Sequence, residues 1–136
     1  MIAILIFVIS ALTLLQFFAS YCHSLIAESH SYELSEHGRK ISGITNHAVR
    51  GDQFRRLQQL IALCPEPGGD NGQVRAVSIY FGMLELGRIL FGWLEPAVAR
   101  WIESERGGCA YVAAVMLDRR IANSRVLMTR QLSTQL

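Results

Sequence analysis

The residues with the clearest potential for chemistry are three histidines spaced one heptad apart, His23, His30 and His37. On a helix they would share one face, because a heptad drifts by only about 20° around the helix axis. Glu33 lies three residues after His30 and four before His37, so its carboxylate would share that face. Two imidazoles and one carboxylate are a ligand set that zinc accepts, which makes His30, Glu33 and His37 a hypothetical metal site.

Two other interpretations of the same histidines stay open. Imidazole titrates near neutral pH, so His23, His30 and His37 also fit a pH-responsive segment. The simpler interpretation is a solvated stalk whose histidines bind nothing, because a metal site needs ligands that further contacts hold in place.

Beyond these histidines, the sequence contains no motif that nominates a reaction. Patterns typical of serine hydrolases, zinc proteases, dinucleotide-binding folds and P-loops are absent from the 136 residues. We therefore expect a protein that is not an enzyme and needs no cofactor; a membrane-bound enzyme with an unrecognised site is the least supported alternative. A net charge of +2 is too small to predict nucleic-acid binding.

The first 22 residues predict a helix that anchors the chain in a membrane. No Asp, Glu, Lys or Arg occurs before Glu28, and Ile2 to Tyr21 would form a helix of roughly 30 Å, the thickness of the hydrocarbon core of a bilayer. No basic residue precedes the apolar run, which favours a retained membrane anchor over a cleaved signal peptide. The residues expected to face lipid include Ile2, Leu5, Phe7, Leu12, Leu15 and Phe18.

The distribution of charge predicts the orientation of this anchor. All 13 Lys and Arg residues follow the span, beginning with Arg39 and Lys40, which favours a C-terminal part in the cytoplasm. Cys22, Cys64 and Cys109 are odd in number and widely spaced, so they suit a reducing compartment better than a disulfide framework.

After the anchor (1–22) we expect a polar helical stalk (23–44), running as a helix at least to His37, and then a small helical domain (45–136). Residues 52–64 predict a helix that Asp52 caps, with an apolar face formed by Phe54, Leu57, Leu60, Ile61 and Cys64. Pro65 to Gly72 predict a connecting loop.

Two longer helices complete the predicted three-helix bundle. The first, at 73–94, is apolar around most of its circumference, so we expect it to be central, with a partner-facing or membrane-lying helix as the alternative. Its Glu85 and Arg88 can pair, and its glycines at 82, 87 and 92 predict close approach of a neighbour. The second, from 96 to about 130, would bury Val98, Trp101, Ile102, Cys109, Val112, Val115 and Met116, leave Glu103, Glu105 and Arg106 on other faces, and bend or break at Gly107 and Gly108.

The sequence thus predicts an all-α, single-pass membrane protein that acts as a non-catalytic accessory or scaffold subunit. Besides membrane lipid, its expected partner is another membrane-associated protein or a second copy of itself. The residues predicted to bind that partner lie on the wide apolar helix: Phe81, Leu84, Phe91, Trp93 and Leu94.

Overall fold

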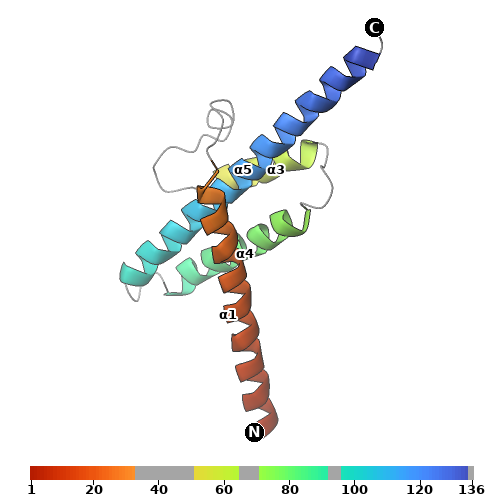
Figure 1. The fold of residues 1–136 in the computed structure, drawn as a ribbon. Coiled ribbons are helices and arrows are strands. Elements are labelled where there is room, and N and C mark those ends of the chain that lie inside the picture. Colours follow the sequence, from red (N-terminus) through yellow and green to blue (C-terminus); the bar gives the residue numbers. More distant parts are fainter. Residues whose placement is uncertain (33–50, 65–70, 92–95, 135–136) are drawn as a thin grey trace.

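The computed structural model describes residues 1–32, 51–64, 71–91 and 96–134, and these ranges are helical with no strand. The helices are α1 (Ile2–His30), α3 (Gly51–Leu63), α4 (Asn71–Phe91) and α5 (Pro96–Thr134), arranged as shown in Figure 1. The prediction of an all-α protein is confirmed.

The central helix of the fold is α5. Helices α1, α3 and α4 each pack on α5, and α1 also contacts α4. Every residue from Val112 to Asp118 is buried, so the middle of α5 is covered on all sides. The expectation that the helix at 73–94 would be central is wrong, because α4 buries only the face that carries Val77, Tyr80, Phe81 and Leu84.

Helix α1 differs from the predicted anchor and solvated stalk in its second half. It ends at His30, where the Ser31 backbone N–H and hydroxyl both donate to the Glu28 carbonyl, at 3.2 and 2.6 Å. Cys22 and Ile26 are buried in the core together with residues of α3, α4 and α5. The core is therefore shared by four helices, and residues 22–30 are packed against the domain on one face; residues 33–44 lie outside the described ranges.

Helix α3 buries the face that its sequence predicts. Phe54, Leu57 and Ile61 are buried, and the Phe54 ring stacks on Phe81 of α4 with 4.0 Å between ring centroids. Asp52 lies inside the first turn of α3 rather than before it, because the helix already begins at Gly51. A carboxylate in that turn still stabilises the helix through its interaction with the helix dipole.

Helix α5 continues through Gly107 and Gly108 without a break, and α1 packs closely against α5 at Gly108. A Cβ atom on Gly108 would lie 2.7 Å from Cγ2 of Ile26. The glycines of α4 were expected to permit such contact, but Gly82 faces open space and Gly87 would meet Ile102 only at an ordinary 3.8 Å. Gly92 lies outside the described residues.

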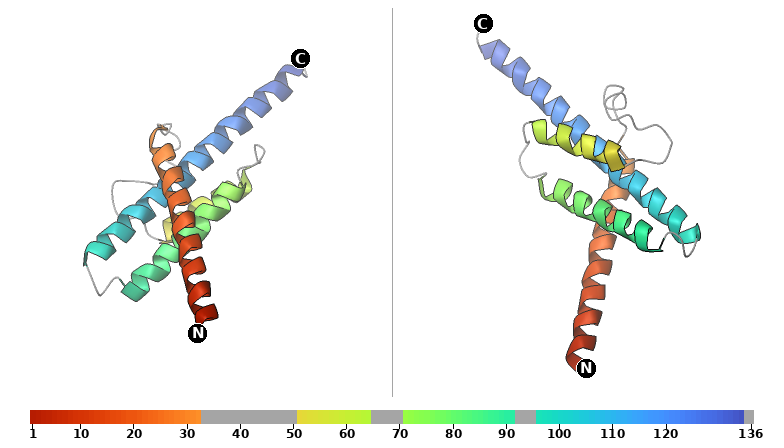
Figure 2. Two further views of the ribbon diagram at one scale, coloured as in Figure 1. Left: turned by 60° about the horizontal axis from the view of Figure 1, so that its bottom comes forward. Right: turned by 180° about the vertical axis from the view of Figure 1, so that it is seen from behind.

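The two ends of the chain project from opposite ends of the molecule. Figures 1 and 2 show the N-terminal half of α1 leaving the domain on one side and the C-terminal part of α5 leaving it on the other. Every residue from Ile2 to Phe17 is exposed, as is every residue from Arg125 to Thr134. Trp101, expected in the core, is 55% exposed near the start of α5.

Two neighbouring glycines of α5 allow the contact with α1 to be tested. Gly107→Ala should stabilise the full chain by about 1 kcal/mol, because alanine favours a helix and its methyl group meets no atom within 4 Å. Gly108→Ala gains the same helix propensity but must displace Ile26, so it should be less stable than Gly107→Ala by about 1–3 kcal/mol. Thermal unfolding in mild detergent, followed by circular dichroism, measures this difference. Equal stability of the two variants would show that α1 does not pack closely at Gly108.

Candidate functional site

The predicted metal ligands fall only partly within the described residues. Glu33 and His37 lie outside them. The imidazole of His30 stacks on the ring of Tyr111 in α5, with 4.9 Å between centroids and 16° between planes. Within ranges 1–32, 51–64, 71–91 and 96–134, no group of three or more His, Cys, Asp or Glu residues is placed to hold a metal ion.

The predicted partner-binding residues lie on two different sides of α4. Phe81 and Leu84 are 7% and 5% exposed, so they belong to the core and not to an open surface. Phe91 is 57% exposed, whereas Trp93 and Leu94 are outside the described ranges. The sequence analysis missed the opposite face of α4, where Ile79, Leu86 and Ile89 are exposed; the seven-residue spacing of Ile79 and Leu86 was the available signal.

The residues expected to face lipid form a bare apolar rod. One described helix, α1, is long and apolar enough to cross a membrane, and none of the residues in its most apolar window of 18 is fully buried. Among the residues expected to face lipid, Phe18 is the exception because it is partly buried. Its ring packs edge-on against the ring of Tyr80, with 6.3 Å between the ring centroids. The exposed members are Ile2, Leu5, Phe7, Leu12 and Leu15.

The functional candidate that emerges from the structure is the junction where α1 crosses α4 and α5. A carboxylate lies at its centre: Glu105 of α5 is only 8% exposed. The Tyr80 hydroxyl donates to Glu105 Oε2 at 3.1 Å, and Nδ1 of His23 lies 3.3 Å from Oε1. Each oxygen of the carboxylate thus has a partner on a different helix, α4 for one and α1 for the other.

The junction keeps the Tyr80 phenol and the Cys109 thiol neutral. Burial, together with the nearby Glu105 carboxylate, raises the pKa of Tyr80 well above its ordinary value, so the phenol stays protonated and can donate. Burial is also the main cause that raises the pKa of Cys109 to about 12, with smaller contributions from Cys22 and Glu105. A thiol with that pKa is not a nucleophile at neutral pH. The junction is therefore built to hold three helices together, since its polar groups satisfy one another.

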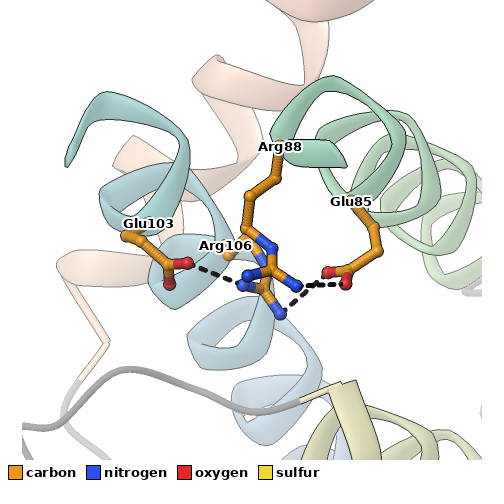
Figure 3. A network of polar contacts seen from close by, with 4 residues as sticks. All are labelled: Glu85, Arg88, Glu103 and Arg106. Carbon is orange, nitrogen blue, oxygen red and sulfur yellow. Dashed lines mark hydrogen bonds and ion pairs between the residues drawn. The ribbon is translucent and has the colours of Figure 1, made fainter. Parts of the chain in front are cut away.

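A second polar network joins α4 to α5 next to the junction (Figure 3). The guanidinium of Arg106, 4% exposed, lies between two carboxylates, at 2.9 Å from Glu85 and 2.8 Å from Glu103, and faces the Phe81 ring at 5.2 Å. Arg88 pairs with Glu85 at 3.0 Å, as the sequence predicts. Glu105 and Arg106 were expected on other faces of α5; the structure buries both and gives each a polar partner from another helix, the Tyr80 hydroxyl of α4 and the His23 imidazole of α1 for Glu105, and the Glu85 carboxylate of α4 for Arg106.

A third contact fastens the ends of α3 and α4 to α5. Arg120 of α5 is 3% exposed. It donates to the Ile61 carbonyl at 2.9 Å and to the Asn71 side-chain oxygen at 3.1 Å. The Ile61 carbonyl is one of the last in α3 and also accepts from the Cys64 backbone N–H at 3.3 Å, so Arg120 adds a second donor at the end of α3.

Two hollows border these contacts. An apolar groove of about 480 Å³ between α1 and α4 is lined by Phe7, Ser10, Ala11, Leu14, Leu15, Phe18, Ile79 and Met83. A cleft of about 410 Å³ between α3 and α4 is lined in part by Gln58 and Ser78, which bond to each other: Gln58 donates to Ser78 at 2.5 Å, and Ser78 donates to the Val74 carbonyl at 2.7 Å. The Ser78 hydroxyl thus gives its proton to a backbone carbonyl and not to a side chain that could act as a base.

No protein-family model, no curated protein and no solved structure matches this chain.

Replacing Arg106 tests how much the α4–α5 network contributes to the free energy of unfolding. In Arg106→Met the apolar stem remains while Glu85 and Glu103 lose their shared partner. We expect the free energy of unfolding to fall by about 2 kcal/mol. This is less than for a fully buried pair, because the side chains of Glu85 and Glu103 are each about one third exposed to solvent. Arg88→Met is the control: it removes an exposed partner of the same Glu85 and should cost under about 1 kcal/mol. Detergent-solubilised full chain, unfolded by heat or denaturant, gives both values; similar losses would contradict a special role for Arg106.

Proposed function

We propose that this chain is a single-pass, membrane-anchored accessory or scaffold subunit that acts through helix–helix contacts and catalyses no reaction. The observation that carries the proposal is the continuity of α1. One uninterrupted helix supplies both the bare apolar rod from Ile2 to Phe17 and the buried residues Cys22 and Ile26 of the core. A domain joined to its anchor in this way keeps a fixed orientation to the membrane, as a scaffold requires.

The composition of α1 supports its assignment as the membrane anchor. Its most apolar window has a mean hydropathy of 2.6, and large apolar side chains inserted in a bilayer gain free energy while the whole helix satisfies its own backbone hydrogen bonds. In this proposal the helical domain lies on the cytoplasmic side, because the basic residues all follow the span.

The surface proposed for the helix–helix contact is the projecting end of α5, which we call the α5 arm (Arg125–Thr134). Every residue of the arm is exposed, so this part of α5 packs against no other described helix, whereas most helical stability in proteins comes from packing of an apolar face. Its large apolar side chains are all exposed, Met128 by 65% and Leu132 by 63%. These two residues continue the stripe that begins at Leu117 and Ile121 in the domain, at spacings that keep them on one face.

The arm also points away from the anchor, which suits contact with a protein in the aqueous phase. In both views of Figure 2 the C-terminal end of α5 lies on the side of the domain opposite the N-terminal end of α1. A partner helix, from another protein or from a second copy of the chain, would cover the Met128–Leu132 stripe while the anchor stays in lipid.

Placing charges on the arm tests the proposal. Met128→Glu combined with Leu132→Glu should abolish the assembly that the full chain forms in mild detergent, because a partner's apolar face cannot accept two carboxylates. Thr129→Glu combined with Ser133→Glu adds the same charge to neighbouring positions on another face of the arm and should leave the assembly intact. Mass photometry of the purified samples, with mass spectrometry of their components, measures the change.

A monomeric wild-type chain that purifies alone would contradict the proposal. Equal loss of assembly in both double variants would also contradict it, since the effect would then follow charge and not the apolar stripe.

A further inference from the structure

We propose that the outer face of α4, formed by Ile79, Leu86 and Ile89, lies against the lipid bilayer beside the anchor. This inference rests on the proposed membrane placement of α1 and adds a second lipid contact to it. The three side chains are 50%, 57% and 64% exposed, and the face carries no Asp, Glu or Lys. Its only basic residue is Arg75, which is exposed at the start of the helix and has a side chain long enough to reach a lipid phosphate.

The direction in which this face points follows from the groove between α1 and α4. Ile79 and Met83 line that groove together with Phe7, Leu14 and Leu15, which all precede the crossing of the two helices at Phe18 and Tyr80. The face therefore looks toward the N-terminal, apolar half of α1. Leu86 follows Ile79 by one heptad and so points in nearly the same direction.

The length of the exposed part of α1 indicates how deep α4 lies relative to the bilayer. The exposed run from Ile2 to Phe17 is 16 residues, which rise by about 24 Å in a helix, whereas the hydrocarbon core of a bilayer is about 30 Å thick. The span must therefore extend past Phe18, to the level at which α4 crosses α1. The outer face of α4 then lies where the acyl chains meet the headgroups, the position of an interfacial helix.

The polar residues of α4 agree with this placement. Glu85 binds Arg106 of α5 and therefore lies toward the domain, and Arg88 pairs with Glu85 instead of standing on the outer face. The outer face is also continuous with the apolar surface of α1, which lipid covers in the proposed function. We therefore assign the face to lipid and not to a second protein.

Spin labels in the full chain test the depth of this face. Cys64→Ser leaves only Cys22 and Cys109, both fully buried, so a nitroxide attached at Leu86→Cys reports on one site. The chain is reconstituted in nanodiscs of phosphatidylcholine and phosphatidylglycerol. Oxygen, which concentrates in lipid, and a water-soluble nickel chelate are then compared as relaxing agents. Gln59→Cys on exposed α3 is the aqueous control, and Leu5→Cys on α1 is the lipid control.

We expect the ratio of oxygen to nickel accessibility at position 86 to exceed that at position 59 several-fold and to approach the ratio at position 5. A label at position 86 that behaves like the one at position 59 would overturn the inference, since the face would be in water. Protection from both agents would also overturn it, because protein would cover the face. Nickel access at position 5 would show instead that the anchor itself is not in lipid, which would refute the proposed placement of α1 as well.

Discussion

The close packing of the last third of α1 on α5 is the constraint on which the rest of the structure depends. At Gly108 the backbone of α5 comes so near Ile26 that even a methyl group would overlap its side chain. Isoleucine in a helix has one strongly preferred χ1 rotamer, so this contact fixes the rotation of α1 as well as its distance from α5. Because α1 is a single helix from Ile2 to His30, holding its last third also sets the direction in which its apolar first part leaves the domain.

The buried charges of α5 follow from its position between the other helices. A charged group removed from water needs a partner, and α5 finds its partners on the helices that cover it. Glu105 is bound from α4 and α1, Arg106 from α4, and Arg120 from the end of α3 and the start of α4. A shift of any of these helices by one turn would separate a buried charge from its partner. The same contacts that make burial tolerable therefore also fix how the helices align.

The features that could be predicted from the sequence are those that depend on near neighbours in the chain. The apolar length of α1, the buried face of α3 and the Glu85–Arg88 pair all follow from spacings of a few residues. The central position of α5 was not predicted, because only its middle, Val112 to Asp118, is buried on all sides, while the charged Glu105, Arg106 and Arg120 beside it suggested faces open to water. Gly108 resembles the glycines of α4 in sequence, and only its contact with Ile26, far away in the chain, distinguishes it. The histidine heptad assumes one continuous helix, whereas α1 ends at His30; Glu33 and His37 lie outside the described residues, so the metal site stays a prediction.

The exposed apolar surfaces of α1 and α4 have to be explained together. A bare rod of 16 residues joined to a face that carries Ile79, Leu86 and Ile89 is a larger apolar surface than a soluble monomer normally leaves in water. If α1 were the core helix of a soluble assembly, another chain would have to surround the rod and also reach around the groove to cover α4. A bilayer requires no such shape, because lipid adapts to both surfaces at once. The direction of the α5 arm fits the same arrangement, since the end of α5 that points away from these surfaces is the one that carries the exposed Arg125 and Arg130.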